Sequence, residues 1–426
     1  MSTKGLILRI FFQTFHRWAK VSVASMLVVT VLVAASTAQE SAKAEKRPPV
    51  VVTQRALDIH HGSFVFDGHN DLPWEIRTQG SRSFEKIDIA KPQPQLHTDI
   101  ERLKKGGVGA QYWSVYVPAR TAKDGTAHLM TLEQIDIVHA MIAKYPETFE
   151  LARTYGDIVR IRKQGKIASL IGVEGGHSIE DSLEKLRRLH ELGARYMTLT
   201  HSDSLSWADS CSDKSRASGL NEFGKEVVRE MNRLGMLVDI SHVSPQTMQV
   251  VLELTKAPVI FSHSSARAVA DHVRNVPDEI LKQIPKNGGV VMINFFSGFI
   301  VPESAKRASG IFDLRRQWEA KYGDDKAAID REQAKYRAEN PLIPGSVHDV
   351  VDHIEHVIKV AGIDHVGLGS DFDGIAMAPE QLSDVSTYPV ITQALLDRGY
   401  NEADIHKIMS GNIMRVIKKA EEVAGK

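Results

Sequence analysis

The residues of this chain that could carry out chemistry lie at the ends of short apolar segments. Six segments end in a histidine or a carboxylate, and these polar residues are His69, Asp71, Glu174, His201, His242, His263 and Asp371. A single histidine in such a place is more often a hydrogen-bonded loop residue than a ligand. Seven polar groups in equivalent places are not explained in this way, because burying them unpaired would cost several kcal/mol each. The pattern therefore predicts partners such as metal ions.

The spacing of these residues suits two metal ions. His69 and Asp71 are two positions apart, so on an extended strand both point to one side and can bind a single ion. His242 and His263 end neighbouring segments and can bind a second ion. Glu174 lies between the two groups and offers one carboxylate oxygen to each. Imidazole and carboxylate ligands without thiolate favour zinc over manganese or cobalt.

Two such ions would share a bridging water. At a separation of about 3.5–4 Å they lower the pKa of that water enough for hydroxide to exist near pH 7, and they polarise a scissile carbonyl. His201 and Asp371 then remain for acid–base or oxyanion work. We find neither a G-x-S-x-G nucleophile elbow nor a phosphate-binding P-loop. The single cysteine, Cys211, lies in a polar loop without an obvious base, which indicates a free surface thiol.

The elements that must position these residues are eight apolar, β-branched segments. They span residues 64–69, 109–117, 168–175, 195–201, 235–242, 257–263, 288–296 and 364–373. Continuous apolar runs are typical of parallel strands that are covered on both faces. With helical patterns between them, they predict an α/β fold, a (β/α)8 TIM barrel, in which the strand ends converge on one mouth. A doubly wound open sheet is the alternative.

Two of the connecting segments show clear helix signals. Residues 178–193 carry leucines at helical spacing, with Ser178 and Asp181 resembling a capping box. Residues 221–235 repeat the design, with Asn221 as the expected cap and Gly235 as the stop.

The regular alternation is interrupted near the C-terminus. Residues 301–345 contain a highly charged tract of helix-forming composition between the seventh and eighth strands. We interpret it as a helical insertion, either covering the barrel mouth or forming a solvated hairpin. Residues 383–426 predict two helices, with Asn401 as a cap, that pack on the outside of the barrel.

The first residues predict an export signal. A basic segment precedes the uncharged apolar run of residues 21–36, and small residues before Gln39 suit cleavage after Ala38. We therefore expect a signal peptide at 1–38, a linker at 39–50 and a metallohydrolase domain at 51–426. The mature protein would be periplasmic or extracellular. An uncleaved anchor is the alternative, because the run approaches the length of a spanning helix.

Composition narrows the function further. The 53 Lys and Arg balance the 53 Asp and Glu, which argues against a nucleic-acid-binding protein. One cysteine excludes a disulfide scaffold and a cysteine-based zinc cluster. The 18 histidines are the unusual count, and they fit a metal site built without thiolates.

Taken together, the strand-end motifs resemble those of the membrane (renal-type) dipeptidases, zinc peptidases of the amidohydrolase barrel class. The matching strings, in the family's order, are FDGHNDLPW, QYWSVYVP, IGVEGGHSI, RYMTLTH, LVDISHVS, FSHSSARAV with RNVPDE, and DHVGLGSDFDG. They run from Phe66 to Gly374, most of the chain after the leader. The resemblance implies hydrolysis of dipeptides at two Zn²⁺ ions.

The resemblance also implies roles for individual residues. His69 and Asp71 would hold one zinc, His242 and His263 the other, and Glu174 would bridge them. His201 would contact the substrate carbonyl and stabilise the oxyanion, and Asp371 would move protons between water and leaving amine. Arg274 would bind the free carboxylate of the dipeptide, although taken alone it is most simply a surface arginine. Trp74 and Asn70 would line the pocket. The family further suggests a homodimer.

The chain departs from the mammalian members in two ways. A single cysteine cannot supply their disulfides, and the C-terminus lacks the apolar tail of a lipid-anchor signal, so membrane attachment would come only from the N-terminal segment. The charged tract at 301–345 resembles an insertion of bacterial-type members. Two alternative functions remain: another amide substrate, such as a lactam or an N-acyl amino acid, or a non-catalytic barrel that binds ligands.

Overall fold

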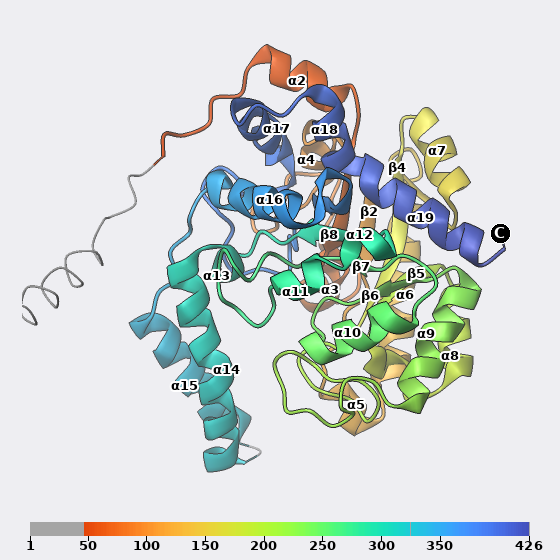
Figure 1. Cartoon of the computed structure of the whole chain (residues 1–426), viewed down its shortest axis with the longest axis vertical. Coiled ribbons are helices and arrows are strands. Elements are labelled where there is room, and N and C mark those ends of the chain that lie inside the picture. Colours follow the sequence, from red (N-terminus) through yellow and green to blue (C-terminus); the bar gives the residue numbers. More distant parts are fainter. Residues whose placement is uncertain (1–46, 324, 426) are drawn as a thin grey trace, which may run out of the picture. The chain divides into compact units, whose positions relative to one another are not determined.

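The computed structural model describes residues 47–323 and 325–425 and contains a closed barrel of parallel strands (Figure 1). The barrel strands are β1 (Val65–Asn70), β2 (Val108–Ser114), β4 (Ile167–Glu174), β5 (Ala194–Thr198), β6 (Leu237–Asp239), β7 (Ile260–Phe261), β8 (Val290–Ile293) and β9 (Val366–Leu368). Each pairs in parallel with the next, β9 returns to β1, and the pairing of β2 with β4 completes the ring. The predicted (β/α)8 barrel is therefore confirmed, and the open sheet is excluded.

One strand was not predicted. The short strand β3 (Phe149–Leu151) pairs with the first residues of β4, from Ile167, while β5 pairs with β4 only from Ile171 onward. β3 therefore lies beside the start of β4 without interrupting the ring. Its residues, Phe-Glu-Leu, include a charge and are not part of a continuous apolar run like those that indicated the other strands.

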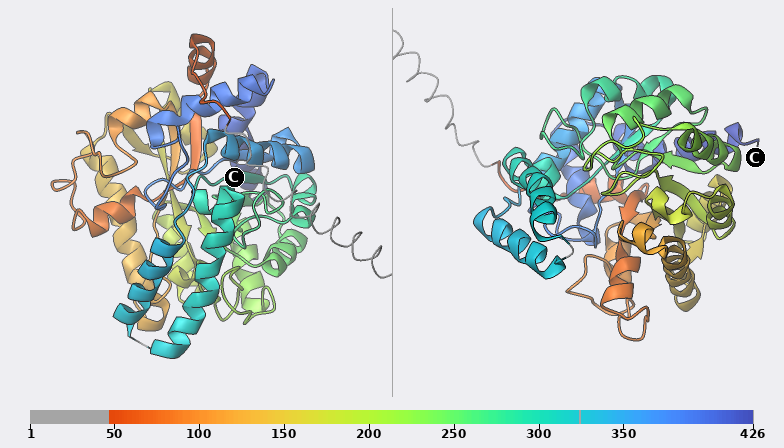
Figure 2. Two further views of the ribbon diagram at one scale, coloured as in Figure 1. Left: turned by 90° about the vertical axis from the view of Figure 1, so that its left-hand side faces the viewer. Right: turned by 90° about the horizontal axis from the view of Figure 1, so that it is seen from below.

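Helices surround the barrel on its outside (Figures 1 and 2). In the first half of the chain they are α2 (Gln54–His61), α3 (Leu72–Thr78), α4 (Ile100–Lys105), α5 (Thr121–Asp124), α6 (Ala127–Lys144), α7 (Tyr155–Lys163), α8 (Leu183–Glu191) and α9 (Glu222–Leu234). In the second half they are α10 (Pro245–Leu254), α11 (Asp278–Leu281), α12 (Ile284–Asn287), α13 (Ser297–Ile300), α14 (Pro302–Tyr322), α15 (Lys326–Glu339), α16 (Val347–Ala361), α17 (Tyr388–Asp397), α18 (Glu402–His406) and α19 (Asn412–Val423).

Alternate residues of each strand enter two different apolar clusters. On β4, Ile171 and Val173 belong to the cluster between strands and helices, whereas Ala168 and Leu170 belong to an inner cluster. Side chains of a strand alternate between faces, so residues of even number on β4 face the barrel interior. Glu174 has the same parity as Leu170, and it is the last residue of the strand. The strand thus directs this carboxylate into the mouth.

The helix predicted from Ser178 begins later than expected. Residues Gly176–Ile179 form a short 3-10 turn (η1), and α8 starts after Ser182, whose side chain accepts from Lys185 N. Asp181 has a left-handed φ of 53°, and its carboxylate accepts hydrogen bonds from Trp207 Nε1 and Ser206 Oγ. This tertiary contact takes the side chain that the capping box would have used. The predicted cap Asn221 and stop Gly235 of α9 are confirmed.

The charged insertion forms a helical hairpin, α14 and α15, that projects from the barrel (Figure 2). Its base is tied to the barrel by Ser297 Oγ, which donates to Pro344 O at 2.7 Å, and Ser304 Oγ donates to Ile343 O at 2.9 Å. The hairpin leaves the chain between β8 and β9, as predicted.

The C-terminal segment forms α17 and a second helical stretch that begins at Asn401 as cap and runs through a π-helical turn, Lys407–Gly411, into α19. Ile413, Val416 and Ile417 of α19 belong to the inner apolar cluster. The same cluster contains Ile158 and Ile161 of α7, so α19 packs against both a neighbouring helix and the barrel strands. An amphipathic pattern shows that a face is buried but does not show against which surface.

The predicted signal peptide at 1–38 lies outside the described residues. Within the described ranges, every helix is too short or too polar to cross a lipid bilayer.

Candidate metal centre and substrate pocket

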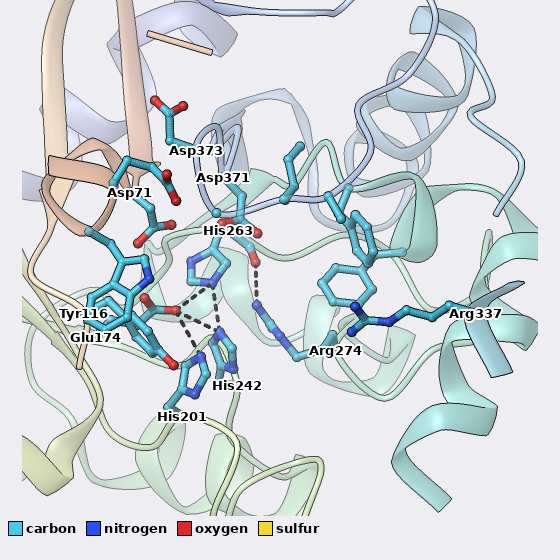
Figure 3. Close-up of a pocket in the computed structure, with 17 residues that line it drawn as sticks. Asp71, Tyr116, Glu174, His201, His242, His263, Arg274, Arg337, Asp371 and Asp373 are labelled. Atoms are coloured by element: carbon cyan, nitrogen blue, oxygen red, sulfur yellow. Dashed lines mark hydrogen bonds and ion pairs between the residues drawn. The ribbon is translucent and has the colours of Figure 1, made fainter. Parts of the chain in front are cut away.

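A cavity of about 440 Å³ opens at the carboxyl ends of the barrel strands (Figure 3). Its polar lining consists of Asp71, Glu75, Tyr116, Glu174, His201, His242, His263, Arg274, Arg337, Asp371 and Asp373. Its apolar lining includes Trp74, Phe296, Phe299 and Ile375. Six of the seven strand-end residues singled out in the sequence thus face one cavity, and the seventh, His69, is fully buried directly behind it.

Glu174 lies at the centre of the polar cluster. Its Oε1 atom is 3.2 Å from His242 Nε2, 3.5 Å from His263 Nε2 and 3.6 Å from His201 Nε2. Its Oε2 atom is 3.4 Å from His69 Nε2, which in turn lies 3.2 Å from Asp71 Oδ2. The two oxygens of one carboxylate therefore face two different groups of nitrogen and oxygen atoms.

The donor atoms fit divalent cations. Three overlapping groups each bring their ligand atoms within 4.8 Å of one another: His69–Glu174–His263, Glu174–His201–His242 and His69–Asp71–Asp371. His69 Nε2 is buried and has no hydrogen-bond partner among the described residues. A buried, unsatisfied nitrogen that points at carboxylates is costly unless another group binds it. Nitrogen and oxygen donors without thiolate suit zinc-like metals.

Hydrogen bonds behind the cluster fix the histidine rings. Tyr196 Oη lies 2.8 Å from His69 Nδ1, and Ser262 Oγ lies 2.8 Å from His263 Nδ1. Ser262 Oγ itself donates to Asp239 Oδ2 at 2.6 Å, so His263 Nδ1–H donates to Ser262. Engaging Nδ1 leaves the Nε2 lone pair directed at the centre, which is how ligand histidines are commonly oriented.

Burial and charge keep three of the donors in the protonation states that metals require. Burial lowers the pKa values of His242 and His263 well below the ordinary value, and the Arg274 guanidinium adds to this effect. Burial alone would raise the pKa of Glu174, but His69 and hydrogen bonds from the surrounding imidazoles hold that pKa well below its usual range. At neutral pH His242 and His263 are therefore neutral and Glu174 is ionised. Burial alone would lower the pKa of His69, but Tyr196, Glu174 and Asp71 raise that pKa well above its ordinary value, so His69 must release a proton when it binds a metal ion.

Asp371 differs from the other carboxylates. Burial raises its pKa to about 8, and the negative charges of Asp71 and Glu174 act in the same direction. Asn294 Nδ2 donates to its Oδ2 atom at 2.8 Å and so orients the group. A carboxyl group that titrates near neutral pH can give up and take back a proton during a reaction.

Three residues that line the cavity, His242, Asp371 and Asp373, have left-handed backbone conformations. His242 and Asp371 both have φ of 64°. This region costs a residue with a Cβ about 1–2 kcal/mol, and such strain is common where function requires a particular side-chain direction. The turn after β9 is held further by Asp373, whose Oδ1 accepts from His97 N at 2.6 Å.

Arg274 reaches the pocket from a loop that follows β7. Its side chain is 3% exposed, so the simpler interpretation of a surface arginine was wrong. Its Nη2 donates to His263 O at 3.1 Å, its Nη1 to Ser264 Oγ at 3.3 Å, and the guanidinium lies over the Phe299 ring at 5.3 Å. Two of its five N–H groups are used in this way, which leaves donors for an anionic ligand.

The sequence of nearly the whole described chain matches one family. Residues 53–426 match the family model of membrane dipeptidase, peptidase family M19. The chain belongs to the membrane dipeptidase family. The predicted resemblance is thereby confirmed, and the protein is a metal-dependent dipeptidase by family.

Solved structures agree with this membership. The probable dipeptidase PvdM from Pseudomonas aeruginosa is 24% identical, with a TM-score of 0.75 over 87% of this chain and 98% of its own. A family M19 metallopeptidase, dipeptidase AC, is 25% identical, with a TM-score of 0.69 over 84% and 98%. A metallopeptidase from Rhodobacter sphaeroides, bound to a phosphinate mimic of the dipeptide L-Ala-D-Ala, is 24% identical, with a TM-score of 0.69 over 84% and 99%.

Asn70, which was predicted to line the pocket of this membrane dipeptidase family member, lies behind the cavity wall instead. Asn70 is fully buried and does not line the cavity. Its Nδ2 donates to Thr98 Oγ1 at 2.9 Å, and its Oδ1 accepts from Leu72 N at 2.9 Å. It therefore braces the turn from β1 into α3. Trp74, on α3, does line the cavity, and its ring packs edge-on against Tyr116 at 5.0 Å.

Several residues of the site were not predicted. Tyr196 and Ser262 lie in strings already singled out, but only the fold shows that they contact His69 and His263. Arg337 comes from the charged insertion, where nothing in the local sequence distinguishes it from its neighbours. Cys211 is free, partly buried and outside the cavity lining, and burial raises its pKa.

Proposed function

We propose that this membrane dipeptidase family member hydrolyses dipeptides at two zinc ions. The observation that carries the proposal is the position of Glu174, with one oxygen facing His242 and His263 and the other facing His69 beside Asp71. A carboxylate shared in this way is what a two-metal centre requires. When bound, the two ions would supply a water nucleophile at neutral pH and polarise the scissile carbonyl.

Three further residues act on the substrate. His201 reaches the cavity beside Tyr116, at a ring distance of 4.9 Å, and would donate to the oxygen of the scissile carbonyl as negative charge develops there. Asp371 would accept the proton of the attacking water and deliver it to the leaving amine. Arg274 would bind the free carboxylate, which sets the distance from the C-terminus to the scissile bond. Trp74 would line the apolar wall.

Metal content and a substrate panel test this proposal. We expect two zinc ions per chain, activity lost with a chelator and restored by Zn²⁺, and lower metal occupancy in Glu174→Gln. The panel should contain L,L and L,D dipeptides, because the Rhodobacter sphaeroides relative binds a mimic with a D-residue in the second position. Full activity of the metal-free protein would refute the zinc mechanism. Cleavage of N-acyl amino acids or lactams without dipeptides would indicate the other amide substrates.

We further propose the organisation of the whole chain. Residues 1–38 would direct export and be removed, 39–50 would form a linker, and 51–426 would form the mature catalytic domain, periplasmic or extracellular and dimeric. Sizing of the exported protein and sequencing of its N-terminus test this proposal. An intact leader in a membrane fraction would favour the anchor.

A further inference from the structure

The cavity has an acidic side and a basic side. The carboxylates of Asp71 and Glu174 lie among the proposed metal ligands. Arg274 points toward His263, and Arg337 lies beyond Arg274 on the side of the cavity away from Asp71 (Figure 3). The proposed function uses only one of these two cations, because a dipeptide has a single α-carboxylate. Arg337 has no role in that reaction.

Arg337 reaches the cavity because the insertion hairpin holds it there. The preceding residue, Tyr336, donates from Oη to Arg307 O of α14 at 3.0 Å, and a Cβ at Gly310 of α14 would overlap that hydroxyl. These contacts fix the end of α15 against α14. The charge of Arg315, on α14, also acts on Tyr116, where it opposes the rise in pKa that burial causes. Arg315 itself does not line the cavity, so Arg337 is the residue through which the hairpin contributes a cation to the lining.

Among the hairpin side chains that the structure describes, none forms an ion pair with Arg337. Lys335 lies 4.0 Å from Glu339, Arg307 lies 3.0 Å from Glu303, and Glu332 accepts from Tyr322 Oη. These pairings occupy the neighbouring acidic groups, and Arg337 has no ion pair with any side chain that the structure describes. An unpaired guanidinium that lines a ligand cavity is suited to recognise a carboxylate.

We propose that Arg337 binds the side-chain carboxylate of the second residue of the substrate, so that the enzyme prefers dipeptides ending in Asp or Glu. This inference rests on the proposed function. With the α-carboxylate on Arg274, the side chain of the same residue starts on the basic side of the cavity. The Phe296 and Phe299 rings line that side and can contact its methylene groups. The amino-terminal residue lies toward the acidic side.

A matched pair of substrates isolates the charge. Ala-Glu and Ala-Gln are nearly identical in shape, so their ratio of kcat/KM measures recognition of the carboxylate. We expect the full-length enzyme to favour Ala-Glu by roughly five- to tenfold, because Arg337 is exposed and a partly solvated ion pair is modest in strength. Arg337→Gln should lower that ratio to about one, mainly by reducing kcat/KM for Ala-Glu. Each substrate should be tested with L- and D-configured second residues.

The controls separate this inference from the proposed function. Arg331→Gln removes the same charge from the same helix at a residue that does not line the cavity, and it should keep the ratio. Arg337→Glu should reduce hydrolysis of Ala-Glu further and raise that of Ala-Lys, which a purely structural role of Arg337 would not do. An unchanged Ala-Glu to Ala-Gln ratio in Arg337→Gln, with both substrates still hydrolysed, overturns the inference alone. Failure to hydrolyse any dipeptide overturns both.

Discussion

Replacing Arg274 by glutamine tests how the substrate carboxylate is read. The guanidinium is 3% exposed and already donates to His263 O and Ser264 Oγ, so a bound carboxylate would be shielded from water by the same walls. A charge-assisted hydrogen bond contributes about 1.5–3 kcal/mol, and a bidentate pair contributes more. Arg274→Gln should therefore cost about 3–4 kcal/mol of substrate binding, or roughly 10²- to 10³-fold in kcat/KM, mostly through KM.

The assay compares a dipeptide with its C-terminal amide. Ala-Ala carries the carboxylate and Ala-Ala amide does not, so the pair of substrates and the pair of enzymes form a double-mutant cycle. We expect hydrolysis of Ala-Ala to fall by the full factor in Arg274→Gln, and hydrolysis of the amide to change by less than about threefold. Zinc content of both proteins should be equal.

One result would refute the reasoning. Arg274 also holds the carbonyl of His263, so its loss could disturb the metal centre instead of the carboxylate site. In that case both substrates would lose activity equally and zinc occupancy would fall. If kcat/KM fell equally for the dipeptide and the amide, Arg274 would act by positioning His263 and not by binding the substrate carboxylate.

Two further predictions concern groups behind the site. Tyr196→Phe should weaken zinc affinity by about 10- to 100-fold, measured by competition with a chelator, because Tyr196 Oη contacts His69 Nδ1; unchanged affinity would contradict this positioning role. His353 should make stability pH-dependent. Its Nδ1 accepts from Ala266 N at 2.9 Å, its Nε2 donates to Ile300 O at 3.0 Å, and burial lowers its pKa to about 4. The unfolded state then binds more protons between pH 6.5 and 4, so stability is complete above pH 6.5 and falls by up to about 3 kcal/mol as the pH drops to 4. In urea unfolding, His353→Gln should show a smaller fall over this range than the unchanged protein, and identical slopes would contradict the assignment.

The strands and the placing of the polar groups could be predicted because both are local properties. A continuous apolar run indicates a parallel strand that is buried on both faces. The polar residue that follows the run lies at the carboxyl end of that strand, which is the mouth of the barrel. Glu174 shows this most clearly, since its parity with Leu170 on β4 alone turns it inward. The roles given to the gathered residues remain predictions.

Other features depend on residues far apart in the chain. Ser178 carries a valid capping signal, but Asp181 is taken by Trp207, so α8 begins at the next available cap. Asn70 was expected in the pocket from the family resemblance, but its amide donates to Thr98, which lies far away in the chain. For Ser178, a local capping preference of about 1 kcal/mol yields to a tertiary contact of similar size.

The sequence alone thus determined the eight strands, the family and the set of polar residues at the mouth, because each is encoded within a few neighbouring residues. Only the tertiary structure decided what surrounds that set. Arg274 is buried because its loop folds back onto His263, and Arg337 reaches the cavity because α15 packs on α14. These contacts depend on packing between segments that are far apart in the chain. A local sequence pattern does not show which surfaces will pack together.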